Sequence, residues 1–216
     1  MNTEHRTSEE SYASACSSSN LTVDDASRGD SDYIIAAGMS KHATGNALMR
    51  LQSEYDKAEH PRMALGAQFY RQAEREKKGQ PASVIAARAH ELAHAHNLHE
   101  TGLLLQQLKT WPAVRQIMIG KALSLGMTAA EDKAVKVLRW FLSKTCTACG
   151  GTKWEVVPGT NRHGAKQCKA CQGTGVAKIP CGEDGRKLAG YIDECMYSAK
   201  GSISRLTRGH KNTRLV

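Results

Sequence analysis

Apolar residues recur at helical spacing along the middle of the chain. Residues 65–80 form an amphipathic segment with basic residues in its last turn, and residues 81–109 keep an apolar stripe that starts behind Pro81. A proline suits the first position of a helix because no N–H has to be satisfied there. A further helix is predicted over 114–126. The centre of the chain is therefore expected to be helical.

The two ends of the chain differ from this centre. Residues 1–31 are rich in Ser, Thr, Asp and Glu and hold few large apolar side chains, which predicts a disordered leader. One or two short helices fit residues 32–51. Residues 128–144 predict an apolar-faced helix that runs into the first cysteine pair. The residues after 185 predict a helix, a break at Lys200–Gly201, and a short basic helix.

These elements predict a mainly α protein. We expect a helical domain with an inserted four-cysteine zinc ribbon or knuckle and a C-terminal part similar to a helix-turn-helix. Aromatic residues make up only 5% of the chain, which favours helices over a sandwich or barrel. We divide the sequence into a disordered leader at 1–31, a helical region at 32–127, and a zinc-containing, nucleic-acid-binding region at 128–216.

The hydropathy of the chain predicts a cytoplasmic protein with no membrane partner. No stretch approaches the ~20 apolar residues that span a bilayer, and the N-terminal residues lack the apolar core of a signal peptide. Thiols stay reduced in the cytoplasm. Paired cysteines in such a chain more often hold a metal ion than form a disulfide.

Charge is distributed unevenly. The net charge of the whole chain is +9, and it comes from −5 in residues 1–60, +3 in residues 61–132 and +11 in residues 133–216. Lysine and arginine side chains that neutralise phosphates release counterions, and this release drives binding to nucleic acids. The C-terminal third is therefore expected to contact nucleic acid, although a solvated basic surface would show the same charge.

Four of the 7 cysteines form two C-x-x-C pairs. The first pair is Cys146 and Cys149, and the second, after 18 further residues, is Cys168 and Cys171. This spacing is typical of a zinc site, and four thiolates complete the tetrahedral shell of Zn²⁺ without leaving a position for water. We therefore predict one structural zinc ion. Further ligands or a weak second site remain open at Cys181, Cys195 and His163.

A second motif, HELAH, covers residues 90–94. His90 and His94 share one face of a helix, as in zinc peptidases of the H-E-x-x-H type, where a residue such as Glu91 acts as the general base. The same segment also holds His96 and His99, so that a histidine-dense helix with an incidental metal-binding patch explains the pattern as well. A zinc-dependent peptidase is kept as an alternative, and we expect no enzymatic activity.

The cysteine units CTACGGTK and CKACQGTG resemble the zinc-binding repeats of DnaJ chaperones. That family carries four such repeats and an HPD signature, whereas this chain has two repeats and a single His-Pro, in HPR at residues 60–62. A DnaJ-like zinc-binding accessory chaperone is a second alternative.

The chain has a closer resemblance to the Q antitermination proteins of lambdoid phages. Three ordered segments carry it: SDYIIAAGMSKHATGNALMRL at residues 31–51, AVKVLRWFLSKTCTACGGT at residues 134–152, and CKACQGTG followed by a helical, basic C-terminus. The resemblance covers about half the chain. Lys153 stands where the second repeat has a glycine, and the histidine-rich helix has no counterpart in that family.

The resemblance implies a phage or prophage regulator of late transcription in the cytoplasm of a bacterial host. Such a protein binds double-stranded DNA at a late promoter, engages RNA polymerase with its sigma factor, and lets the polymerase read through terminators. Beside the zinc unit, the residues expected to contact DNA are Lys187, Lys200, Ser202, Ser204, Arg205, Arg208 and Lys211.

Overall fold

A computed structural model describes residues 7–19, 29–157 and 162–209 of the chain. Most of these residues lie in helices, and two strands form one short hairpin, so the prediction of a mainly α protein is confirmed. They fall into two compact units that are each built from separated stretches of the sequence. The first unit takes residues 1–57, 108–138 and 181–216, and the second takes residues 58–107 and 139–180.

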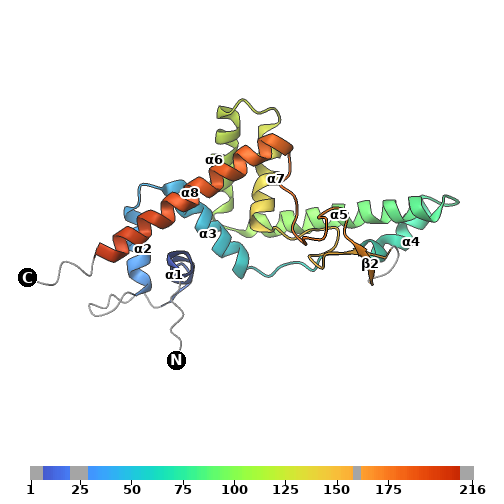
Figure 1. Cartoon of the computed structure of the whole chain (residues 1–216), viewed down its shortest axis with the longest axis horizontal. Coiled ribbons are helices and arrows are strands. Elements are labelled where there is room, and N and C mark those ends of the chain that lie inside the picture. The colour runs from blue at the N-terminus through green and yellow to red at the C-terminus, as the bar shows by residue number, and fades with distance from the viewer. Residues whose placement is uncertain (1–6, 20–28, 158–161, 210–216) are drawn as a thin grey trace, which may run out of the picture. The chain divides into compact units, whose positions relative to one another are not determined.

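The first unit is a helical assembly around the C-terminal helix α8. Its helices are α1 (Ser8–Ala15), α2 (Asp30–Met39), α3 (Ala43–Lys57), α6 (Trp111–Ser124), most of α7 (Ala130–Leu142) and α8 (Gly182–Gly209). In Figure 1, α8 crosses both α3 and α2, and it contacts both helices. The core holds fully buried Leu48 and Leu51 of α3 and Leu188, Ile192 and Ile203 of α8. Burial of these side chains stabilises the unit through the hydrophobic effect.

Helix α8 differs from the prediction. It is continuous from Gly182 to Gly209, so the predicted break at Lys200–Gly201 and the short helix after it are wrong. The buried positions Ile192, Met196, Ala199 and Ile203 repeat every three or four residues across the expected break. The gain from burying this stripe outweighs the cost of about 1 kcal/mol for a glycine inside a helix.

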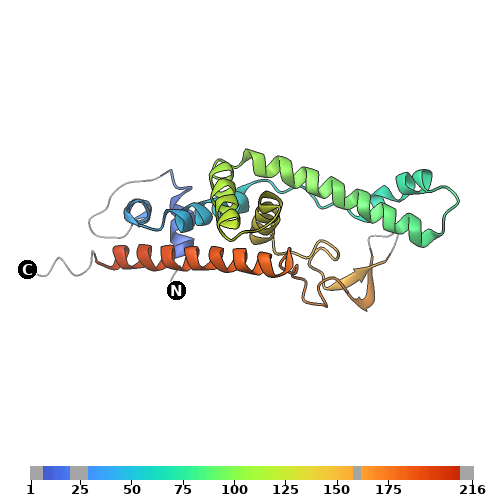
Figure 2. The ribbon, with the colours of Figure 1, turned by 90° about the horizontal axis from the view of Figure 1, so that it is seen from above.

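The second unit contains a long helical hairpin. Helix α4 (Gly66–Glu76) folds back along α5 (Ala82–Gln107), as Figure 2 also shows. Ala73 of α4 packs against Ile85 and Ala89 of α5, and Phe69 adds a partly buried ring to this cluster. Both helices lie close to the bounds that the sequence predicted. Arg88 of α5 also binds Glu76 of α4 at 2.7 Å.

The remaining part of the second unit carries the cysteines. Strands β1 (Trp154–Val156) and β2 (His163–Gln167) pair in an antiparallel way, with Trp154 opposite Gln167. The last turn of α7 leads into this part. The indole N–H of Trp140 in that turn donates to the carbonyl of Ala177, after the second cysteine pair, at 2.9 Å. The hairpin is therefore tied at its base to the helix that precedes it.

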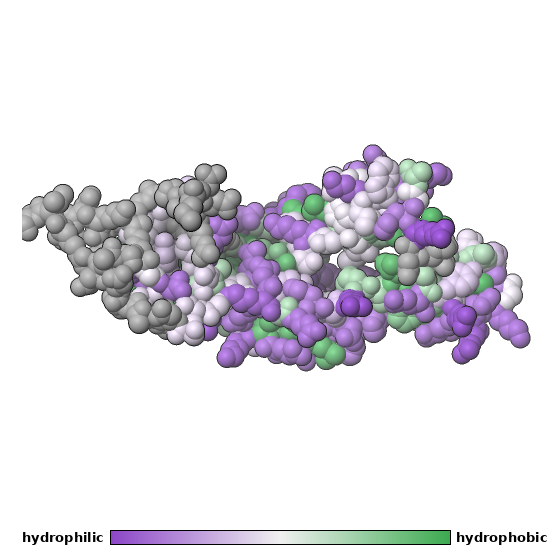
Figure 3. Space-filling view, turned by 90° about the horizontal axis from the view of Figure 1, so that it is seen from below, coloured by the Kyte–Doolittle hydropathy of each residue, from purple (hydrophilic) through white to green (hydrophobic). Residues whose placement is uncertain are grey.

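The predicted regions 1–31, 32–127 and 128–216 and the two observed units group the residues differently. Helix α1 lies inside the predicted leader, whose residues 1–6 and 20–28 are outside the described residues. The extent of the leader stays a prediction. No helix of the described part is both long enough and apolar enough to cross a membrane. Polar side chains dominate the face shown in Figure 3, with apolar ones in small separate patches.

Candidate metal centre

The four predicted cysteines converge in the second unit. Their sulfur atoms all lie within 4.8 Å of one another, and each residue is at most 3% exposed. The sulfurs of Cys149 and Cys171 are 3.8 Å apart. A tetrahedral ion with ligand bonds of about 2.3 Å places its thiolates about 3.8 Å apart. The cluster thus has the dimensions of a site for one metal ion with four thiolate ligands.

The two C-x-x-C turns repeat the same backbone pattern. In the first turn the N–H of Gly151 donates to the carbonyl of Cys146 at 3.3 Å, and in the second the N–H of Gly173 donates to Cys168 at the same distance. The hydroxyls of the two following threonines also match. Thr152 donates to the carbonyl of Cys149 at 2.6 Å and Thr174 to that of Cys171 at 2.7 Å.

Each turn is also bonded to the other one. The N–H of Cys146 donates to the carbonyl of Gly175, and the N–H of Cys168 donates to the carbonyl of Lys153, both at 2.9 Å. Lys153 and Gly175 occupy equivalent places in the two repeats, and their φ angles are 75° and 77°. The structure therefore forms two like halves, although the sequence of the first half departs from the glycine pattern.

The cluster makes its thiols unequal in the metal-free state. Burial raises the pKa of Cys146 to about 12. Burial also opposes ionisation of Cys171, but the N–H of Gly175 and the neighbouring thiols donate to its sulfur and lower its pKa to about 6. The donated bond from Gly175 to this sulfur is 3.3 Å long. The surroundings thus favour the thiolate form of Cys171 and disfavour that of Cys146.

The other candidate ligands lie outside this group, as far as the chain is described. His163 of β2 is 3.2 Å from the hydroxyl of Thr152, through its Nδ1. Cys181 has a left-handed backbone at the start of α8, with φ of 62°. Neither residue belongs to the group of four cysteines that the described residues form.

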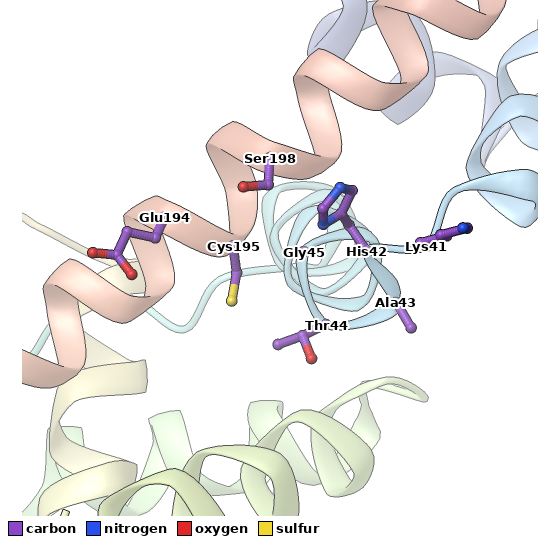
Figure 4. A pocket seen from close by; sticks show the side chains of 8 residues that line it. All are labelled: Lys41, His42, Ala43, Thr44, Gly45, Glu194, Cys195 and Ser198. Carbon is purple, nitrogen blue, oxygen red and sulfur yellow. The ribbon is translucent and has the colours of Figure 1, made fainter.

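Cys195 belongs to the first unit, where it lines a cavity of about 350 Å³ between α8 and the start of α3. Figure 4 shows its sulfur on the side of Thr44, while the ring of His42 lies on the side of Ser198. Cys195 also takes part in a hydrogen bond with Tyr191, whose pKa burial and this bond raise. Cys195 is therefore a packing residue of the first unit.

The HELAH residues lie on α5 in the second unit. His90 and His94 line a cavity of about 560 Å³ whose other wall includes Cys168, Lys169 and Glu155. Glu91 binds Arg88 at 3.1 Å. In the described residues no group of three or more metal-binding side chains includes these histidines. With the described side chains as they lie, no third protein ligand joins His90 and His94, and the peptidase alternative needs one.

Most of the residues predicted to contact DNA lie along α8 (Gly182–Gly209), namely Lys187, Lys200, Ser202, Ser204, Arg205 and the backbone of Arg208. Lys187 is paired with Glu183 at 2.9 Å, and Arg205 is exposed. Lys200, Ser202 and Ser204 are half-buried. The side chain of Arg208 and all of Lys211 lie outside the described residues. The described members of this set therefore lie on one helix, rather than at the start of a separate recognition helix.

The sequence analysis missed the basic residues of the metal unit itself. Residues 139–180 hold seven Lys and Arg against one acidic residue, Glu155, which gives this stretch a net charge of +6. Lys153, Lys166 and Lys169 are exposed, and the side chain of Trp154 is 44% exposed next to Lys153. A count of charge over the stretch between and around the cysteines alone would have found this concentration.

Comparisons of the chain with family models, with curated proteins and with solved structures found no match. The fold and the cysteine cluster stand on their own geometry.

Proposed function

We propose that the protein is a phage or prophage transcription antiterminator, which binds DNA at a late promoter and accompanies bacterial RNA polymerase through terminators. The resemblance in sequence supplies the class of function. The concentration of positive charge on a compact four-cysteine unit is the structural observation that supports it. Such a charge favours a polyanionic partner, because each neutralised phosphate releases a counterion.

Zinc is the metal that we propose for the cluster. Four thiolates in a tetrahedral arrangement favour Zn²⁺, and a fully ligated ion has no open position for a substrate. The ion would hold the two C-x-x-C turns together, so its role in this proposal is structural. A chain of this kind would lose the shape of the hairpin when the metal is removed.

The hairpin is the part of the protein that we propose to meet the DNA. Lys153 is exposed and holds a left-handed backbone that a lysine adopts only at a cost of about 1 kcal/mol or more. Strain of this kind clusters at functional sites. Lys166 and Lys169 add two further exposed cations on the same short segment, and the pair of Lys169 with Glu155, at 3.7 Å, is longer than the 2.9 Å pair of Lys187 with Glu183. These three lysines form the hairpin cation set of the proposal.

Helix α8 has a second place in the proposal. Lys187 is already paired with a carboxylate, which reduces the charge it offers to a phosphate. Arg205 keeps an exposed side chain near the C-terminal end of the helix. We therefore expect the hairpin cation set to contribute more to DNA affinity than Lys187.

The deciding experiment is single-round transcription through a terminator, on a template with the late promoter that adjoins the gene. Wild-type protein should raise read-through. A variant with Cys168→Ser and Cys171→Ser should lose this effect because the metal unit no longer forms. The variant with Lys153, Lys166 and Lys169 changed to Ala should bind zinc normally and yet lose read-through.

Lys187→Ala is the matched control, because it removes a lysine that lies on α8, outside the hairpin, and is paired with Glu183. It should keep most of the read-through activity. Each phosphate contact contributes a slope of about −0.9 to log K against log salt on duplex DNA, so the triple variant should also show a shallower slope. Folded, zinc-loaded wild-type protein that leaves termination unchanged on this template would refute the proposal.

A further inference from the structure

The histidine pair of α5 faces the metal unit and has no part in the proposed function. His90 and His94 line the same cavity, together with Glu155 of β1. Both histidines are exposed, so an ion from solution reaches them without unfolding. Imidazole nitrogens and a carboxylate oxygen are ligands that first-row transition metals accept.

The spacing of the pair suits chelation. Residues four apart on a helix have Cβ atoms about 5–6 Å apart on one face, so two imidazoles at this spacing can bind one ion. The helix holds both residues in register, because α5 runs without interruption from Ala82 to Gln107. A chelate of two imidazoles loses little conformational freedom on such a support.

Hydrogen bonds and close packing fix the part of the cavity wall that lies around His90. The side-chain amide of Asn97 donates to the carbonyl of Ala64 at 2.9 Å, and its oxygen accepts from the N–H of Ala64 at 2.8 Å. Gly66, two residues on, leaves room for the ring of His90. A Cβ at Gly66 would lie 2.7 Å from Nδ1 of that ring. The loop before α4 is thus shaped around His90.

The other polar residues of the histidine-rich segment have different surroundings from His90 and His94. His96 has its ring 5.6 Å from that of Phe69, in a tilted arrangement typical of packing. Glu91 is held by Arg88 and does not line the cavity among the described residues. Glu155 does line it, and its carboxylate is only loosely paired with the exposed Lys169 at 3.7 Å. The cavity therefore combines two imidazoles with an acidic group.

We propose that His90 and His94 form a second metal site, distinct from the four-cysteine cluster, for an exchangeable divalent transition cation of the Ni²⁺, Co²⁺ or Zn²⁺ class. The two imidazoles are the protein ligands, and the remaining positions are filled by water or by Glu155 after a change of its rotamer. With two fixed ligands the site is weaker than the four-thiolate cluster and exchanges its ion with the solution. The antiterminator proposal does not depend on this site.

The test is calorimetric titration of the untagged, zinc-loaded full-length chain with Ni²⁺, followed by metal analysis after gel filtration. The expected result is one bound Ni²⁺ beside one retained Zn²⁺. His90→Ala with His94→Ala should lower the affinity for Ni²⁺ by about tenfold or more, since loss of supporting residues alone costs about 10–100-fold at metal sites. His96→Ala with His99→Ala removes the same number of imidazoles from the same helix and should leave the affinity within about twofold of wild type.

His94→Ala alone guards against a folding artefact, because it leaves His90 packed against Gly66 and still breaks the chelate. Circular dichroism and zinc content should be unchanged in all variants. Three results would overturn the proposal: no Ni²⁺ bound beyond the cluster, equal losses in the two double variants, or full affinity in the variant that lacks His90 and His94. The same titration with Glu155→Gln tells whether the carboxylate is a ligand, since an uninvolved Glu155 leaves the affinity unchanged.

Discussion

Lys153 adopts the backbone conformation of Gly175. The two residues hold φ angles of 75° and 77°, and each offers its carbonyl to the first cysteine of the opposite turn. This conformation strains a lysine, because its Cβ clashes with the backbone, and it does not strain a glycine. The two halves of the metal unit therefore have the same backbone geometry but not the same intrinsic stability.

Lys153→Gly should raise the free energy of unfolding by about 0.5–1 kcal/mol, because glycine adopts this left-handed backbone conformation without the steric clash of a Cβ. It should also weaken DNA binding, since an exposed cation is lost from the hairpin cation set. Thermal unfolding of the zinc-loaded protein and a binding titration at fixed salt measure the two effects. A variant that gains stability and keeps full affinity would remove Lys153 from the proposed interface.

Gly175→Ala is the reciprocal change. A Cβ at this position would lie 2.7 Å from the carbonyl oxygen of Gly151, in addition to the strain of a φ of 77°. We expect lower stability and weaker zinc retention in a competition with a chelator. Gly150→Ala is the control, since its φ of 58° brings similar strain but no atom lies within 4 Å of an added Cβ. It should cost less.

Local signals in the sequence predicted the four cysteines of the buried cluster and most helices. Backbone hydrogen bonds within each C-x-x-C turn hold its two cysteines close together. The spacing of Cys146, Cys149, Cys168 and Cys171 along the chain was therefore enough to predict the cluster. The long helix α5 followed from its apolar stripe and from Pro81, which precedes it directly. The helix predicted over 114–126 begins earlier, at Trp111, and has Pro112 in its first turn.

Nonlocal packing decided what the sequence analysis missed. Gly201 suggested a break, but Ile203 and Thr207 continue the buried stripe of α8 beyond it. The first unit combines separated stretches of the sequence, and contacts between residues far apart in the chain hold these stretches together, such as that of Glu54 with Thr110. Periodicity reports only which face of a helix is buried, and not which segment covers that face.

Gly45→Ala should destabilise the first unit strongly. A Cβ on Gly45 would lie 2.1 Å from the carbonyl oxygen of Cys195 and 2.6 Å from Cβ of Ala199, so α3 and α8 would have to separate. Overpacking of a tight contact typically costs about 1–3 kcal/mol. Urea unfolding followed by circular dichroism measures the loss.

Gly190→Ala on α8 is the control for this change. No atom lies within 4 Å of a Cβ added there, so the substitution should raise stability by about 0.5–1 kcal/mol through its higher helix propensity. If both alanine variants shift the urea midpoint in the same direction, the close contact between Gly45 and Cys195 does not control the packing of α3 on α8.

Metal removal should act on one unit. A chelator should abolish the structure of the hairpin, because its two cysteine turns depend on the common ion. Most helical signal should remain, since α1, α2, α3, α6 and α8 belong to the other unit. Amide hydrogen exchange by mass spectrometry, with and without zinc, should show lost protection at residues 145–157 and 162–177. Equal loss of protection in both units would mean that they fold as one cooperative body.

Asp184→Asn should lower stability at neutral pH and have no effect in acid. The carboxylate of Asp184, in the first turn of α8, accepts from the ammonium of Lys133 on α7 at 2.6 Å, and this bond holds the pKa of Asp184 below its ordinary value. A lowered folded-state pKa means that the carboxylate stabilises the fold at pH values above its unfolded pKa of about 4. The stabilisation is lost as the pH falls through the folded-state pKa.

The thermal midpoints of wild type and Asp184→Asn should therefore differ at pH 7 and converge as the pH falls from about 4 through the lowered folded-state pKa of Asp184. Glu183→Gln is the matched control, because Glu183 stands in the same helical turn but pairs with Lys187 of its own helix, with both side chains more than half exposed. Its loss should be smaller because exposed pairs contribute little. Equal losses in the two variants would assign the effect to the helix terminus, and a larger loss for Asp184→Asn assigns it to the link between α7 and α8.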